Sequence, residues 1–177
     1  MFAMLCTSLL VPFLLATLVP ATALPKRQPS TWESPFPGTI LSPTRGQLFQ
    51  FGSELPFAYQ VSSWCEPAFA PFTVYLTAGP NPPVFDNVTA DGTLADGSYL
   101  VDFGKFVVSR FGLPSPGPAP PSTLTMPLLN VDFTVVSPFF IAVIEEFQGC
   151  PASASTCGDI AVEYSLASVP IILGANS

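Results

Sequence analysis

The sequence contains no histidine and few charged residues of either sign. Without histidine, the chain can form neither a Ser-His-Asp nor a Cys-His nucleophile pair, and no histidine-ligated zinc or copper site. Only 10% of the 177 residues are charged, and 5 basic against 12 acidic residues give a formal net charge of −7. An acidic surface repels phosphate backbones, so we expect no nucleic acid partner.

Apolar residues, in contrast, are abundant. The chain is 49% hydrophobic and 12% aromatic, and it contains 22 prolines and 16 phenylalanines. This apolar content is too high for a disordered chain, and the length is typical of one domain.

The first 25 residues carry no charged side chain. An apolar run, Leu5 to Val19, is followed by Ala21-Thr22-Ala23, which predicts a secretory signal peptide over residues 1–23. The alternative is a membrane anchor, but a bilayer requires about 20 apolar residues, and this run is shorter and contains Pro12. We therefore expect a secreted, extracellular protein, associated with a cell wall or free, with no stable membrane insertion.

A dibasic pair, Lys26-Arg27, follows the expected cleavage after Ala23. It resembles a fungal processing-protease site, after which the mature chain would begin at Gln28 with three basic residues left. The alternative is a solvated pair that is not processed. Residues 24–37 are interpreted as a propeptide and extended leader outside the core, because positions 28–38 contain three prolines and no periodicity.

Short segments with strand character and turn residues between them fill the rest of the chain. They lie at residues 39–41, 48–51, 55–59, 72–76, 97–108, 124–126, 139–147 and 160–167. This pattern predicts one all-β domain over residues 38–173, an antiparallel immunoglobulin-like or fibronectin-like sandwich of seven to eight strands. A jelly roll or small barrel is the alternative.

Two proline features refine this prediction. Pro56 places its strand at an edge or at a bulge, because proline donates no hydrogen bond to a sheet. Residues 112–121 are half proline and are expected to form a stiff surface crossover between strands. A recognition motif for a partner domain is the alternative reading of this segment.

Three of the 4 cysteines remain after the signal peptide, which contains Cys6, is removed. A Cys65–Cys150 disulfide is expected, because both residues fall in loops that meet at one end of such a sandwich. A Cys150–Cys157 disulfide is the alternative, favoured by proximity in the sequence. Three cysteines without histidine are not an ordinary zinc set, so no metal site is expected.

The acidic residues do not form a recognisable catalytic or metal site. Glu145 and Glu146 are adjacent on a strand, so they point to opposite faces, and we interpret them as a strand end that emerges into solvent. Four aspartates recur at near-regular spacing, but two precede glycine in turns and the spacing does not match a helix-loop-helix calcium site: Asp86, Asp91, Asp96 and Asp102.

Two features indicate surface chemistry. Asn87-Val88-Thr89 is an N-glycosylation sequon in a segment without strand pattern, and we expect it to be occupied. The aromatic residues least committed to a core stripe are Trp64, Phe69 and Tyr75. If exposed, these three rings are candidates for stacking on sugars; ordinary loop packing is the alternative.

Several stretches resemble a known family, and they come in this order: Gly38 to Pro43 with Gly46, Leu55 to Tyr59, Cys65, Phe72 to Leu76, Leu124 to Pro127, and Val143 to Cys150. Together they resemble small secreted β-sandwich proteins of mushroom-forming (basidiomycete) fungi over residues 38–172. The opening Ile-x-Ser-Pro-x-x-Gly is similar, more weakly, to immunoglobulin-like modules of fungal cell-wall glucan-assembly proteins. The resemblance implies secretion and a β-sandwich, and supplies no catalytic residues.

These observations favour a secreted, non-catalytic module without a cofactor that binds the cell wall, a polysaccharide or a surface protein. A carboxylate-dependent secreted glycosidase is the first alternative and would require two carboxylates that converge in a cleft. A secreted effector that acts on a host or competitor is the second.

Overall fold

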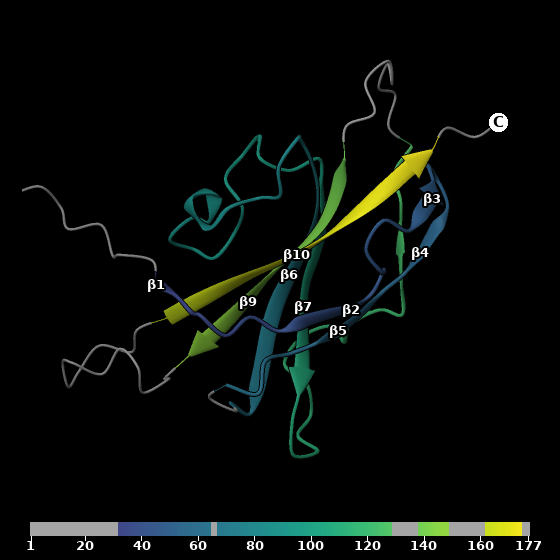
Figure 1. Ribbon diagram of the computed structural model, residues 1–177. Coiled ribbons are helices and arrows are strands. Elements are labelled where there is room, and N and C mark those ends of the chain that lie inside the picture. Colours follow the sequence, from purple (N-terminus) through teal and green to yellow (C-terminus); the bar gives the residue numbers. More distant parts are fainter. Residues whose placement is uncertain (1–31, 65–66, 129–137, 149–161, 175–177) are drawn as a thin grey trace, which may run out of the picture.

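The computed structural model describes residues 32–64, 67–128, 138–148 and 162–174. Within these ranges the chain forms ten strands and one short 3-10 helix (Figure 1). They are β1 (Trp32–Glu33), β2 (Thr39–Ser42), β3 (Leu48–Gln50), β4 (Glu54–Pro56), β5 (Ala58–Gln60), β6 (Phe69–Ala78), η1 (Phe85–Asn87), β7 (Val101–Ser109), β8 (Thr123–Thr125), β9 (Phe139–Gln148) and β10 (Val162–Gly174). The predicted all-β fold is confirmed. Within the same ranges, no helix has the length and apolar character to cross a membrane.

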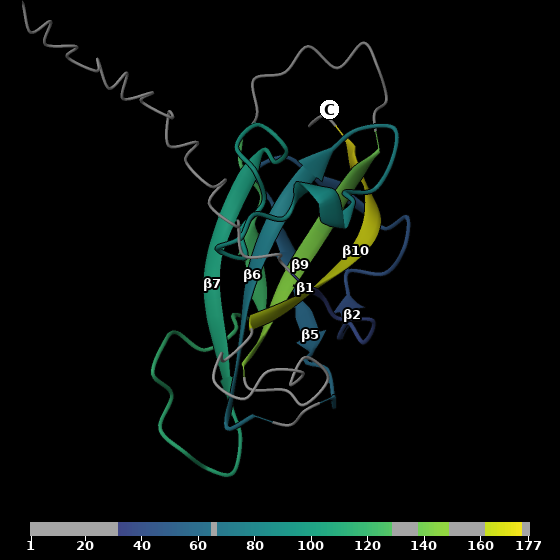
Figure 2. The ribbon, with the colours of Figure 1, turned by 90° about the vertical axis from the view of Figure 1, so that its left-hand side faces the viewer.

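The larger layer is a sheet in the order β1-β10-β9-β6-β7. Figure 2 shows β7, β6, β9 and β10 side by side in this curved sheet. Strands β10, β9, β6 and β7 pair antiparallel in turn, whereas β1 and β3 pair parallel with opposite ends of β10. Strand β9 thus lies at the centre of the sheet, which explains its nearly continuous apolar sequence.

The second layer consists of two antiparallel pairs, β2–β5 and β4–β8. The main core lies between this layer and the sheet, and the residues that form it alternate along the strands. They are Phe49, Phe51, Leu55, Phe57, Phe72, Val74, Leu76, Leu124, Met126, Phe139, Ile141, Val143 and Ile171. This arrangement confirms the predicted sandwich, but the described residues form ten strands rather than seven to eight, and β1 and β3 add parallel pairings to an otherwise antiparallel arrangement.

Pro56 is the last residue of β4, and the pairing changes immediately after it. Strand β4 pairs with β8, but from Ala58 the chain pairs with β2 instead. Between the two strands, the N–H of Phe57 donates to the carbonyl oxygen of Ser122 (2.8 Å). Pro56 therefore ends an edge strand, where its missing N–H leaves no gap in a ladder, as its sequence position predicts.

The outer face of the sheet is covered in its central part by the segment around η1, which Figure 2 shows on the side of the sheet opposite β2 and β5. Val88 and Leu94 of this segment form a second apolar cluster with Tyr75, Ala142 and Ile144 from β6 and β9. Strand β9 is therefore covered on both faces, as its sequence predicts.

The predicted boundary of the N-terminal leader is wrong at its C-terminal end. Trp32 and Glu33, placed in the leader, form β1 and pair with Glu163 and Tyr164 of β10. The N–H of Ser34 continues the contact by donating to the carbonyl oxygen of Tyr164 (2.7 Å). Backbone hydrogen bonds to a free strand edge need no side-chain pattern, so periodicity could not reveal this strand.

The proline-rich crossover contains no strand and follows the outer edge of β7. The carbonyl oxygen of Pro118 accepts a hydrogen bond from the N–H of Val107 (2.9 Å). The expected surface crossover over residues 112–121 is confirmed.

Candidate functional site

A surface groove of about 540 Å³ lies where two separate segments of the chain run side by side. One segment, residues 35–39, carries the chain from β1 in the large sheet to β2 in the second layer, a path that Figure 1 shows. The other, residues 60–64, leaves the end of β5. The lining consists of Pro35, Phe36, Pro37, Gly38, Thr39, Gln60, Ser62, Ser63 and Trp64.

An aromatic pair joins the two walls of the groove. The ring centroids of Phe36 and Trp64 are 4.5 Å apart, with planes tilted by 31°. Phe36 is 47% exposed, and Trp64 is half-buried. The backbone N–H of Trp64 donates to the hydroxyl of Ser62 (3.1 Å), which fixes the loop under the indole. The indole Nε1 is buried and has no hydrogen-bond partner within the described residues.

A buried carboxylate supports the groove from behind. Glu145 of β9 is 1% exposed. It accepts a hydrogen bond from the Tyr59 hydroxyl (2.7 Å), and its two oxygens lie 3.0 and 3.2 Å from the backbone nitrogen of Ser62. The Nη2 of Arg110 donates to the carbonyl oxygen of Ser62 (2.6 Å). The backbone of one groove residue, Ser62, is thus held at its N–H by the Glu145 carboxylate and at its carbonyl by the Arg110 guanidinium.

Burial sets the electrostatics of this cluster. Loss of hydration raises the pKa of Glu145, and hydrogen bonds from Tyr59, Ser62 and Gly38, with the charge of Arg110, partly offset that rise. Burial and the neighbouring carboxylate raise the pKa of the Tyr59 hydroxyl, so it remains a proton donor to Glu145.

Gly38 allows the groove wall to approach this cluster. A Cβ atom at position 38 would overlap the hydroxyl oxygen of Tyr59 and the carbonyl oxygen of Gln60. Only glycine permits so close an approach of backbone to side chain. The wall contributed by residues 35–39 therefore rests directly on Tyr59.

The structure separates the three aromatic residues that the sequence indicated. Trp64 lines the groove. Phe69 begins β6, is half-buried and is not part of the groove lining. Tyr75 does not meet the condition of exposure on which it was a candidate, because it is 1% exposed beneath the segment that carries η1. It does point away from Phe72, as strand alternation requires, but that face is covered.

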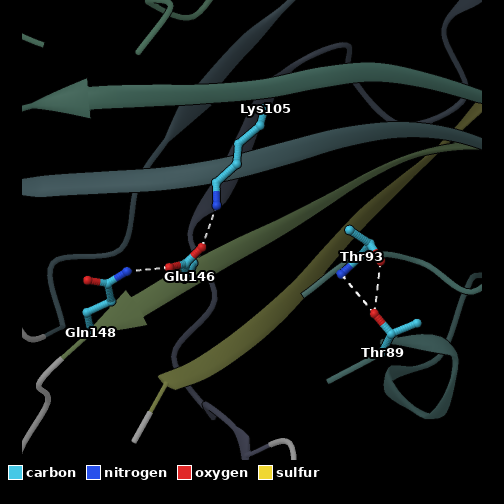
Figure 3. A network of polar contacts seen from close by, with 5 residues as sticks. All are labelled: Thr89, Thr93, Lys105, Glu146 and Gln148. Atoms are coloured by element: carbon cyan, nitrogen blue, oxygen red, sulfur yellow. Dashed lines mark hydrogen bonds and ion pairs between the residues drawn. The ribbon is translucent and has the colours of Figure 1, made fainter. Parts of the chain in front are cut away.

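The adjacent acids lie on opposite faces, as predicted, but their environments differ. Glu145 faces the core side, so the expected solvent exposure is wrong for this residue. Glu146 faces the other side, where it accepts hydrogen bonds from the Lys105 Nζ (2.6 Å) and from Gln148 (Figure 3). The Lys105 side chain is 55% exposed, and such surface pairs contribute about 0–1 kcal/mol.

Two of the four aspartates fit the turn interpretation, whereas Asp86 lies in η1 and Asp102 in β7. Gly92 and Gly97, which follow Asp91 and Asp96, have φ values of 73° and 83°, the region that glycine adopts readily. Within the described ranges, no group of three or more acidic, cysteine or histidine side chains is placed to hold a metal ion.

The sequon lies on the segment that covers the outer face of the sheet. Asn87 ends η1 and is half-buried, and its carbonyl oxygen accepts from the N–H of Ala95 (2.8 Å). Figure 3 shows the hydroxyl of Thr89, the third sequon position, in contact with Thr93, 2.9 Å away. The glycosylation of Asn87 stays a prediction.

The remaining expected sites lie outside the described residues. These are the processing residues Ala23, Lys26 and Arg27 and the cysteines Cys65, Cys150 and Cys157.

Sequence reasoning missed Phe36, Gly38 and Glu145. A signal for Glu145 was present, because it shares alternate positions with the core residues Ile141 and Val143. No local pattern connects Phe36 with Trp64. Comparison of the chain with protein-family models, curated proteins and solved structures finds no match.

Proposed function

We propose that this protein is a secreted, non-catalytic module that binds a cell-wall polysaccharide or a surface protein through the groove between residues 35–39 and 60–64. The observation that carries the proposal is the Phe36–Trp64 pair, which presents aromatic surface beside hydroxyl and amide side chains. Ligand sites typically combine apolar and aromatic surface with a few polar groups that fix orientation.

The hydrogen bonds behind the groove wall support a binding role. The Glu145, Tyr59 and Arg110 contacts hold the backbone of Ser62 in place before any ligand arrives. A wall that is already ordered loses little conformational freedom on binding, so more of the contact energy appears as affinity.

The placement of the carboxylates supports a non-catalytic role. A glycosidase of the usual kind requires two carboxyl groups about 5–10 Å apart in one cleft. Glu145 is buried behind the groove with its oxygens occupied, and Glu146 lies on the opposite face of β9.

Secretion is part of the proposal and rests on the signal-like segment 1–23 and on the resemblance to secreted fungal proteins. The sequon at Asn87 is consistent with passage through the secretory pathway.

Retention of the purified mature chain on insoluble cell-wall material tests the proposal. Trp64→Ala and Phe36→Ala should each weaken retention about tenfold, because aromatic anchors dominate recognition energy. Phe111→Ala is the matched control, since Phe111 is 75% exposed but does not line the groove. Circular dichroism and thermal unfolding establish that each variant folds.

Two results would contradict the proposal. Unchanged retention of folded Trp64→Ala and Phe36→Ala variants would discard the groove as the binding surface. Turnover of a glucan, chitin or peptide substrate, abolished by replacement of one carboxylate, would discard the non-catalytic role.

A further inference from the structure

We infer that the ligand of the groove is an uncharged polysaccharide chain, and that the groove discriminates against charged polymers. This inference rests on the proposed function, and it selects one ligand class from those that the proposal leaves open.

The first argument is the lack of charge in the lining. Each of the nine described residues that line the groove is neutral. The two charged groups directly behind it, Glu145 and Arg110, are directed to the N–H and the carbonyl of Ser62, so their charges are used within the protein. An ionic group of a ligand would lose hydration in the groove without gaining a partner there, which is costly.

The second argument is what the lining offers instead. Thr39, Gln60 and Ser63 are exposed, and within the described residues their side chains make no hydrogen bond. Thr39 and Gln60 are also paired in register on β2 and β5, so their positions are fixed by the strands. Hydroxyl and amide groups donate and accept hydrogen bonds without charge, which matches the hydroxyls of a sugar.

The third argument is the aromatic pair. A pyranose ring has an apolar C–H face that packs on an aromatic ring, and Phe36 and Trp64 provide such surface at one place.

The size of the groove favours a few sugar units over a folded protein. A volume of about 540 Å³ falls within the range typical of small-ligand sites, about 300–1,000 Å³. A stable protein interface instead uses about 20–30 residues on each side. A surface protein is therefore the alternative that the experiment must distinguish.

The net charge of −7 makes the protein respond differently to anionic and to cationic polymers. Anionic polymers are repelled by the acidic protein as a whole. Cationic polymers are attracted at long range, but this attraction is screened at physiological salt, and the described residues of the groove lining include no acidic partner.

Affinity electrophoresis of the mature chain at 0.15 M salt tests the inference. The neutral probes are a soluble β-1,3-glucan, β-1,4-glucan oligosaccharides, chitin oligosaccharides and mannan; the charged probes are polygalacturonate and chitosan. We expect at least one neutral probe to bind about tenfold more tightly than either charged probe, and Trp64→Ala to remove this difference. Gln60→Lys should weaken neutral binding and create salt-sensitive binding to polygalacturonate.

The outcomes separate the inference from the proposed function. Trp64-dependent retention on wall material, together with equal or tighter binding of a charged probe, would overturn the inference alone. Trp64-dependent capture of a wall protein without binding to any neutral probe would do the same. Loss of all Trp64 dependence would overturn both.

Discussion

The hydroxyl of Tyr59 donates a 2.7 Å hydrogen bond to the carboxylate of Glu145, and this contact joins the second layer of the sandwich to the central strand of the first. Tyr59 also packs on Phe72, with ring centroids 4.9 Å apart. A polar contact therefore closes one end of an otherwise apolar core. Without this contact, the Tyr59 hydroxyl and one Glu145 oxygen would each lose a hydrogen-bond partner away from water, which costs more free energy than the bond itself contributes.

Glu145 should make the protein more stable in acid than near neutral pH. Burial raises its folded-state pKa above the ordinary value of 4.5, so the folded protein binds the proton more tightly than the unfolded chain. This stabilisation is complete below pH 4.5 and is lost as the pH rises through the folded pKa. Urea unfolding of wild type between pH 4 and 8 should show the decline, and Glu145→Gln should show a flatter profile.

Glu145→Gln removes the charge at this site and keeps a hydrogen-bond acceptor, whereas a second substitution, Glu145→Ala, removes both. Glu145→Ala leaves the Tyr59 hydroxyl and the Ser62 N–H without their acceptor, so it should lower the free energy of unfolding by about 1–3 kcal/mol at every pH in the series. Equal pH slopes in wild type and Glu145→Gln would contradict the assignment of the raised pKa to this carboxyl.

Gly38→Ala should disturb both stability and ligand retention. The added Cβ would overlap the Tyr59 hydroxyl, so the wall must move at a cost of about 1–3 kcal/mol. Gly174→Ala is the matched control, because a Cβ there would meet the Leu48 side chain at 3.5 Å and the Phe49 carbonyl oxygen at 3.9 Å, both ordinary contact distances. Thermal unfolding and wall retention should fall for Gly38→Ala only; an unchanged Gly38→Ala variant would show that the wall adapts.

The Cys65–Cys150 disulfide remains our prediction for the oxidised protein. Its support from the described residues is that Ser62 contacts Glu145, so the segments that lead toward these two cysteines come together. Peptide mapping under non-reducing conditions should recover a linked pair of peptides that contain Cys65 and Cys150. Recovery of Cys150 joined to Cys157 would refute the prediction and leave Cys65 as the free thiol.

Secretion should yield a protein that begins at Leu24 or at Gln28, according to whether Lys26-Arg27 is processed. Both start points retain β1, which begins at Trp32. Intact-mass analysis of the culture medium distinguishes the two. A membrane-bound product that retains Met1 would contradict the signal-peptide interpretation.

The strands could be predicted because their side chains alternate between core and surface. Val74 and Leu76 face the core while Thr73 and Tyr75 face the other side, and this alternation is visible in the sequence. The burial of Tyr75 could not be predicted, because its face is covered by the segment around η1, which lies outside the sheet. The alternation of side chains shows which residues of a strand share a face, but it does not show whether another segment covers that face.

The groove could be predicted only in part. Trp64 was identified as an aromatic residue in a loop, but its partner Phe36 reaches it because β1 joins the edge of β10. That pairing is made by backbone N–H and C=O groups, which do not depend on the side chain. Tyr59 and Glu145 are separated by 86 positions, and their contact depends on how the two layers are stacked.

The proline-rich segment beside β7 has a consequence for how copies of this protein behave at high concentration. An exposed strand edge is a template on which another chain can add a strand, a first step toward fibrils. Here the Pro118 carbonyl occupies the outward N–H of Val107 on one edge of the sheet, and β1, Gly46 and β3 occupy positions along β10 on the other. These contacts leave fewer backbone groups free at both margins of the sheet for the addition of a strand from another copy.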